Sequence, residues 1–150
     1  MKKLTVDLKI IGVVHSPYKN TSEAPFQGED TISEIEIFRE YFDGLKDIDG
    51  FSHLHVFYWL HESQGFSLLV KTPWDTKLHG LFTTRSPHRP NPLGHAVVEL
   101  VERKENTLVV KGLDAIDGTA VIDIKPYVKR LDIKNDAVSG WAEQTDLERD

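Results

Sequence analysis

Cysteine is absent from this 150-residue chain. Without a thiol the protein forms no disulfide, offers no thiolate ligand to zinc and has no cysteine nucleophile. Long apolar runs are absent too, since no stretch approaches the roughly 20 residues that a bilayer-spanning helix needs, and the N-terminus lacks a signal-peptide pattern. We therefore expect a cytoplasmic protein that makes no membrane contact.

Three common catalytic signatures are missing as well. The chain has no Gly-x-x-x-x-Gly-Lys phosphate loop, no Gly-x-Gly-x-x-Gly dinucleotide fingerprint and no Gly-x-Ser-x-Gly nucleophile elbow. An ordinary ATPase, a dinucleotide-dependent enzyme and an α/β-hydrolase therefore lack support.

Basic side chains are in the minority, with 18 lysines and arginines against 24 aspartates and glutamates, and the net charge is −6 with histidine neutral. This balance argues against broad, unaided nucleic-acid binding, which needs a basic face, but it leaves a local basic patch open. The length fits one ordinary domain, and the 39% hydrophobic content is that of a globular protein.

The hydrophobic pattern is that of short strands separated by turn residues. The predicted strands are residues 4–15, 34–37, 51–60, 67–70, 80–84, 95–102, 107–113 and 121–128, and 95–102 pairs with 107–113 as a hairpin. Only Ile37 to Leu45 has a helical pattern. The series predicts an all-β sandwich or barrel with one short helix and irregular loops. We place this domain at residues 1–132 and a polar tail, held in part by Trp141, at 133–150.

The segment from Thr84 to His95 is typical of a rigid functional loop. Three of the chain's seven prolines fall within residues 87–92, which excludes a helix or an interior strand. Fixed proline φ angles order the loop before a ligand arrives and so reduce the cost of binding. Because Arg85, Arg89 and Asn91 crowd the same loop, a binding role is favoured over a plain connection.

Two weaker patterns remain ambiguous. Asp117-Gly118 is a tight-turn pair, and by itself it indicates only a turn. His53, His55 and His61 occupy odd positions of one predicted strand and would share a face. Such histidines bind a transition metal when a third ligand converges, but no carboxylate stands at suitable spacing. Half-buried histidines with ordinary hydrogen bonds are the favoured alternative, and no metal is expected.

Five motifs in order resemble one family. They are residues 11–18, 51–54, 80–94, with its unusual Arg-Ser-Pro-x-Arg-Pro-Asn-Pro string, 117–119 and 123–127. The chain resembles the TsaA-like family, whose characterised members are the TrmO-type S-adenosylmethionine-dependent tRNA adenine-N6 methyltransferases. The resemblance implies a compact antiparallel β-barrel, a homodimer with the methyl donor near the subunit contact, and methylation of N6 of threonylcarbamoyladenosine beside the anticodon.

The resemblance also implies which residues form the sites. The donor site would draw on Pro25, Phe26, Gln27, His61, Glu62, Arg85, Pro90, Asn91, Pro92, Leu93, Asp117, Gly118 and Thr119. The N6 nitrogen of this nucleoside is urea-like and needs a base, for which Asp117, Tyr127 and His95 are the candidates. Arg89, Lys125 and Arg130 are the candidate anchors for tRNA phosphates.

The chain departs from the family pattern at two positions and in its length. Phe26 and Ala120 stand where the family often has arginine and proline, and longer members carry a C-terminal domain that helps to bind tRNA. A second subunit is therefore expected to complete the RNA surface. Two alternatives stay open: a methyltransferase of this fold with another substrate, and a non-enzymatic barrel that binds a ligand, or a metal through His53 and His55.

Overall fold

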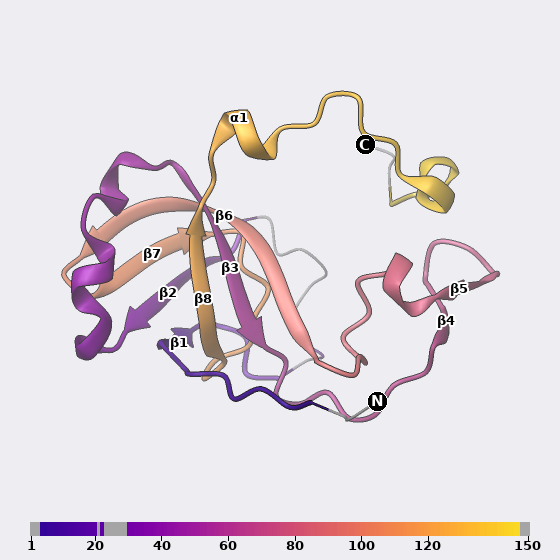
Figure 1. The fold of residues 1–150 in the computed structure, drawn as a ribbon, viewed down its shortest axis with the longest axis horizontal. Helices are drawn as coiled ribbons and strands as arrows, with labels where there is room; N and C mark the ends of the chain where they lie inside the picture. The colour runs from indigo at the N-terminus through magenta and orange to yellow at the C-terminus, as the bar shows by residue number, and fades with distance from the viewer. Residues whose placement is uncertain (1–3, 21, 23–29, 148–150) are drawn as a thin grey trace. The chain divides into compact units, whose positions relative to one another are not determined.

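The computed structural model describes residues 4–20, 22 and 30–147. The chain divides into two compact units, of which the first comprises Met1–Glu62 and Leu93–Tyr127, and the second Ser63–Pro92 and Val128–Asp150. The first unit holds a β-barrel and the second a two-stranded sheet (Figure 1). Within the described residues, no helix has the length and apolar character to cross a membrane.

Six antiparallel strands of the described residues close into the barrel in the order β1-β2-β7-β6-β3-β8. Their bounds are β1 Gly12–His15, β2 Ile32–Ile37, β3 His53–Trp59, β6 Leu93–Lys104, β7 Thr107–Lys111 and β8 Ala120–Pro126. This architecture confirms the predicted all-β barrel. The predicted hairpin is β6–β7, with Leu100 opposite Val110.

Alternation along the strands builds the core. In β2, Ile35 and Ile37 are buried while Glu34 faces solvent, as the period of two requires. The side chains with no exposed surface are Val14, Ile35, Leu54, Val56, Val98, Leu108, Val110, Leu113 and Val121. Burying each such side chain contributes about 1.5–3 kcal/mol, so the barrel interior is the main stabilising feature of this unit.

The two ends of the barrel differ in what covers them. At the loop end, β1 and β3 finish and β6 and β8 begin, since Trp59 pairs with Leu93. At the cap end, the 3₁₀ helices η1 (Arg39–Leu45) and η2 (Ile48–Gly50) follow the end of β2. The helix predicted for Ile37 to Leu45 is thus a 3₁₀ helix. Leu45 is the one buried residue of η1, which suits a short i→i+3 turn better than an amphipathic α-helix.

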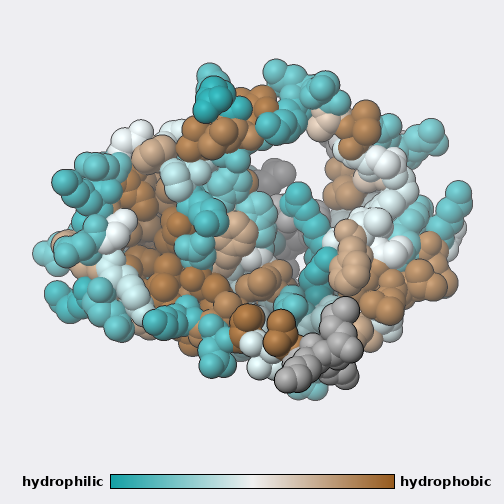
Figure 2. Space-filling model, viewed as in Figure 1, coloured by the Kyte–Doolittle hydropathy of each residue, from teal (hydrophilic) through white to brown (hydrophobic). Residues whose placement is uncertain are grey.

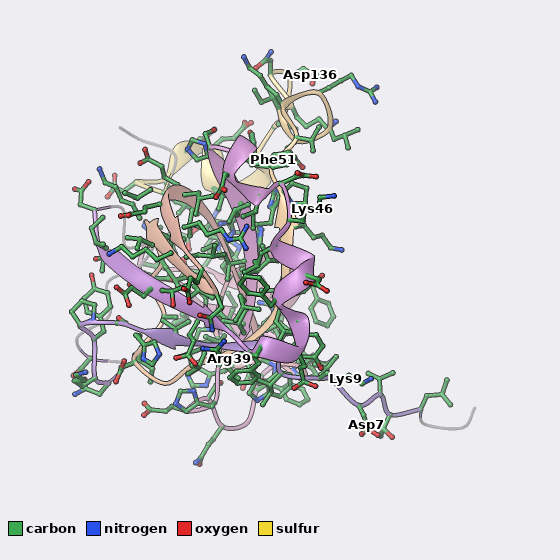
Figure 3. The ribbon with its side chains drawn as sticks, turned by 90° about the vertical axis from the view of Figure 1, so that its left-hand side faces the viewer. Asp7, Lys9, Arg39, Lys46, Phe51 and Asp136 are labelled. Carbon is green, nitrogen blue, oxygen red and sulfur yellow. The ribbon has the colours of Figure 1, made fainter. Side chains whose placement is uncertain are left out.

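The strand predicted for residues 4–15 is wrong over most of its length. Only Gly12–His15 pairs with neighbouring strands, and β8 meets β1 only at Gly12 and Val13. Residues 4–10, which we call the arm, are exposed and pair with no strand of the described residues. Asp7 and Lys9 lie on this arm, which extends away from the barrel (Figure 3). An alternating pattern gives a strand only where a partner supplies the hydrogen bonds.

The second unit contains the hairpin β4 (Leu69–Lys71) and β5 (Leu78–Gly80). The strand predicted for residues 80–84 is wrong, because Leu81–Thr83 forms the 3₁₀ helix η3. The hydroxyls of Thr83 and Thr84 donate to the carbonyls of Gly80 and Leu81 at 2.8 Å and close this turn. Threonine hydroxyls compete with strand hydrogen bonds in this way.

The C-terminal segment also belongs to the second unit. It carries α1 (Lys129–Asp132) and η4 (Gly140–Gln144). Trp141 stacks on His79 with ring centroids 4.0 Å apart, and its Nε1 donates to the Thr83 carbonyl at 3.1 Å. These contacts confirm the expected anchoring by Trp141. The domain boundary at residue 132 stays a prediction.

Tyr58 on β3 stands opposite Gly94 on β6. A Cβ atom on Gly94 would lie 2.3 Å from the Tyr58 ring, so only glycine leaves room for it. The ring is buried, and its hydroxyl donates to the Asp114 carboxylate. Burial and the neighbouring carboxylate raise the pKa of Tyr58 far above its usual value, so the phenol stays protonated and remains a donor.

We predict that Gly94→Ala destabilises the protein by roughly 1–3 kcal/mol, because the added methyl group overlaps the Tyr58 ring. Urea unfolding followed by circular dichroism measures the change. Gly44→Ala is the matched control, since a Cβ atom at that position would meet no other atom within 4 Å, and it should stay within about 0.5 kcal/mol of the natural protein. Equal stability of the two variants would contradict the packing constraint.

Candidate functional site

The turn Asp117–Thr119 at the loop end is bound to the segment that follows β1. Asp117 accepts hydrogen bonds from the Ser16 backbone N–H at 3.0 Å and from Lys19 Nζ at 3.1 Å. Its own N–H donates to the Tyr18 carbonyl at 2.6 Å, and the Gly118 N–H donates to the Val14 carbonyl at 2.8 Å. Two segments about a hundred residues apart in sequence therefore form one joined surface.

These contacts define what Asp117 can do. The Ser16 N–H, and after it Lys19, lower the pKa of Asp117 below its usual value. A carboxylate held in its ionised form by two donors is a weak base but a stable negative charge. The geometry favours a role in positioning the turn and attracting a cation. Gly118 has φ +85° and open space on its Cα, so a ligand can approach its backbone closely.

Five rings form a row on the outer face of the barrel, across β3, β6 and the end of β8. The ring row consists of His53, Tyr127, His55, His95 and Phe57. His55 stacks on His95 with ring centroids 5.2 Å apart, and Tyr127 lies 5.5 Å from His55. Since His95 is exposed and His55 partly so, these rings offer an aromatic surface to solvent.

His55 and His95, at the centre of the ring row, are joined by a hydrogen bond. His55 Nδ1 and His95 Nε2 are 3.0 Å apart, so one ring donates to the other. In a neutral pair, whichever ring donates, one outer nitrogen carries no hydrogen and can accept a proton. Lys125 is opposite His55 in the β3–β8 register and is exposed, with an ion pair to Asp123 at 3.2 Å. The ring row thus combines stacking surface, a proton acceptor and a nearby cation.

The proline-rich loop of the second unit is held by its own arginine. Arg89 donates from one guanidinium nitrogen to the carbonyls of Thr84 at 2.9 Å and Ser86 at 3.1 Å. The hydroxyl of Ser63 donates to the Pro87 carbonyl at 2.8 Å. Arg89 therefore positions the loop, whereas Arg85 is exposed and available to an anionic ligand.

Comparison with known proteins settles the family. Residues 13–133 match the tRNA-methyltransferase O N-terminal domain. The chain belongs to this family. The match spans the barrel, the proline-rich loop and the Asp117–Thr119 turn, and it confirms the resemblance to TrmO-type proteins.

Individual relatives agree with this family. The chain is 55% identical over 144 residues to a probable S-adenosyl-L-methionine-binding protein of Archaeoglobus fulgidus, covering 94% of this chain and 39% of that protein. It is 34% identical over 146 residues to the tRNA (adenine(37)-N6)-methyltransferase of Escherichia coli K12, covering 89% and 62%. The crystal structure of TrmO from Pseudomonas aeruginosa matches with a TM-score of 0.79 at 29% identity, covering 95% and 65%. The chain thus spans less than two thirds of each.

Within this tRNA-methyltransferase O domain, the predicted site residues fall into three groups. His61, Glu62, Leu93, Asp117, Gly118 and Thr119 belong to the loop end of the first unit, and His95, Lys125 and Tyr127 to its outer face. Arg85, Arg89, Pro90, Asn91, Pro92 and Arg130 belong to the second unit. Pro25, Phe26 and Gln27 lie outside the described residues. The structure brings His95 and Tyr127 together around His55 and ties Asp117 to a different set of partners.

The three histidines predicted to share one face of a strand do not do so. His61 lies beyond the end of β3, in a turn closed by its N–H donating to the Trp59 carbonyl at 3.0 Å, so it does not continue the face of His53 and His55. Among the described residues, no three histidine, aspartate or glutamate side chains gather as metal ligands would. The sequence signal for the ring row was that His53, His55 and Phe57 occupy successive odd positions of β3 and so share a face.

The cap end of the barrel holds a pocket that no sequence pattern predicts. It has a volume of about 560 Å³ and lies between η1, η2 and β8, with Ile11, Tyr41, Phe51 and Ile124 in its lining. Figure 2 shows hydrophobic residues gathered between η1 and β8. Two further lining residues, Lys46 and Phe51, can be found by their labels in Figure 3. Of the predicted site residues that the structure describes, none lines this pocket. Most of its lining comes from residues 37–54, and Ile11, Asp123, Ile124 and Pro126 join this segment only when the barrel closes.

We predict that Asp117 stabilises the fold in a pH-dependent way. Because its folded pKa is depressed, the contribution is fully present above the unfolded pKa of roughly 4 and is lost as the pH falls through the folded value. Urea unfolding of the natural protein and Asp117→Asn between pH 7 and pH 2 measures this. The stability difference should shrink at the acid end. Asp49→Asn, an exposed carboxylate on η2, is the control and should show no such trend.

Proposed function

We propose that this chain is the catalytic domain of an S-adenosylmethionine-dependent methyltransferase acting on N6 of an adenosine in tRNA. The match of residues 13–133 to the tRNA-methyltransferase O N-terminal domain carries the proposal. A relative at 34% identity is a tRNA (adenine(37)-N6)-methyltransferase, and a relative at 50% identity is an S-adenosyl-L-methionine-binding protein. The finer substrate we propose is threonylcarbamoyladenosine beside the anticodon.

The residues present suit the methyl donor. The donor carries an α-carboxylate, an α-ammonium group and a sulfonium, and when bound it supplies an electrophilic methyl group. Exposed Arg85 can pair with the carboxylate through two parallel hydrogen bonds. The ionised Asp117 and exposed Glu62 can attract the cationic groups, and Gly118 permits close backbone approach. The backbone groups of Leu93 can hydrogen-bond the adenine edge.

The ring row suits the acceptor nucleoside. Single-stranded RNA is recognised by stacking unpaired bases on aromatic rings, and this stacking is sequence-tolerant because every base has a π-face. His95 and Tyr127 flank His55 in this row, and Lys125 can contact a phosphate of the same strand. This arrangement reconciles RNA binding with a chain of net charge −6.

Among the three candidate bases, the contacts favour His95. The N6 proton must leave as the new C–N bond forms, so a nearby group with an accepting nitrogen or oxygen is required. His95 shares a hydrogen with His55, and this pair can accept the proton. Asp117 is a weaker base because its pKa is lowered. Arg89, Lys125 and Arg130 remain the proposed phosphate contacts, Arg89 through the guanidinium nitrogens that do not bond its own loop. We also propose that two copies of the chain assemble as a homodimer.

The decisive experiment combines the protein, S-adenosylmethionine and tRNA that carries threonylcarbamoyladenosine. We expect nucleoside mass spectrometry to show the gain of one methyl group on that nucleoside, and calorimetry to show donor binding. Arg85→Ala should weaken donor binding about tenfold or more, since a charge-assisted contact contributes about 1.5–3 kcal/mol, whereas Lys71→Ala on β4 should bind normally. Donor binding without tRNA methylation would point to another acceptor. No donor binding at millimolar concentration would refute the function.

We predict that His95→Phe and His95→Ala separate stacking from proton transfer. Phenylalanine keeps the ring, so His95→Phe should bind RNA and donor normally but lose about 100-fold in single-turnover rate. His95→Ala should lose the same rate and also weaken RNA binding about fivefold or more, as removal of one stacking ring does. Val97→Ala, an exposed neighbour on β6, is the control. A normal rate for His95→Phe would assign the proton acceptor to another group, with Tyr127 the next to test.

A further inference from the structure

The arm, residues 4–10, has the alternating pattern of a strand but pairs with no strand of the described residues. Leu4, Val6, Leu8 and Ile10 alternate with Thr5, Asp7 and Lys9. The four apolar side chains are 89%, 82%, 47% and 50% exposed. They have the same parity as Gly12 and Val14, which face the barrel interior. Four large apolar side chains on one face of an extended segment are unusual on a free surface and indicate a binding partner.

The arm's own unit supplies no partner among the described residues. β1 begins only at Gly12, and β8 bonds it at Gly12 and Val13, with one further bond from the Ile11 N–H to the Val121 carbonyl at 2.9 Å. From Ile10 back, the arm leaves the barrel, as the positions of Asp7 and Lys9 show (Figure 3). Within the described residues, no strand bonds to the backbone of the arm, so a strand of another chain can pair with it.

We infer that the arm pairs antiparallel with the arm of a second copy, with Leu8 on the two-fold axis. This register sets Leu8 opposite Leu8, Val6 opposite Ile10, and Asp7 opposite Lys9. The apolar side chains then share one face, and the other face carries two pairs of opposite charge, each of which stabilises a strand pair. Centring the pair on Asp7 would instead place two carboxylates directly opposite each other, which destabilises it.

The neighbouring surface supports this partner. Ile11, the residue after the arm, lines the apolar pocket between η1 and β8. An apolar surface thus begins where the arm ends, and it can cover the apolar face of the paired arms. A two-fold contact of this kind is self-complementary, so one strip of sequence supplies both sides. The inference deepens the homodimer proposed above by naming the residues that join the two copies.

The absence of cysteine from the chain permits a direct test by single-cysteine cross-linking. Residues directly opposite in an antiparallel pair have Cα atoms about 4.5–5.5 Å apart, within disulfide range. Under mild oxidation we expect Leu8→Cys to form a covalent dimer at least about tenfold more efficiently than Asp7→Cys or Lys9→Cys. An equimolar mixture of the last two variants should cross-link, because position 7 faces position 9. Thr5→Cys is the matched control on the same arm.

Charge reversal tests the same register without a covalent bond. Asp7→Lys places lysine opposite Lys9 twice in each dimer, and we expect the dimer dissociation constant to rise about fivefold or more in sedimentation equilibrium. The double variant Asp7→Lys/Lys9→Asp restores opposite charges and should restore the dimer. Circular dichroism checks that each variant is folded.

The possible outcomes separate this inference from the proposed function. Equal cross-linking at positions 7, 8 and 9, or a stable dimer with no cross-link at position 8, would overturn the arm pairing even if the protein binds S-adenosylmethionine normally. A position-8 cross-link in a protein that binds no donor would leave the pairing intact and refute the methyltransferase. A monomeric protein at all concentrations would refute the pairing outright.

Discussion

The buried hydroxyl of Tyr58 is the interaction on which the loop end of the barrel depends. Its ring fits only because Gly94 on the facing strand has no side chain. Its hydrogen bond to Asp114 then holds the chain that leads into the Asp117–Thr119 turn. The Asp117–Thr119 turn is itself hydrogen-bonded to the segment that follows β1. One phenol therefore links the β3–β6 pair to the surface that we assign to the methyl donor.

In the proposed RNA complex, the ring row stacks on bases and the basic residues contact phosphates. An acidic chain gains little from broad attraction to phosphates, because that attraction needs many cations on one face. The ring row offers a different source of affinity, since each stacked base contributes without regard to net charge. Lys125 beside it supplies orientation. A count of basic residues overstates the attraction to phosphates, because one guanidinium nitrogen of Arg89 already donates to two carbonyls of its own loop.

Sequence patterns predicted some elements better than others for identifiable reasons. The hairpin β6–β7 was predictable because two apolar segments flank a short polar turn. Residues 80–84 were misassigned because their threonine hydroxyls bond backward to carbonyls and form a turn. The arm was assigned as a strand from a correct pattern, but strand formation also requires a partner, which the described residues of one chain do not provide.

By itself, the sequence determined the all-β class, the rigidity of the proline-rich loop and the family, since these depend on local alternation, fixed proline angles and an unusual motif. Only the tertiary structure decided which side chains act together. In the folded barrel, His95 and Tyr127 both contact His55, and Asp117 accepts hydrogen bonds from Ser16 and Lys19. Residues of η1 and β8 line a pocket. The reason is physical: strand register in a closed barrel decides which distant residues become neighbours, and no local pattern encodes that register.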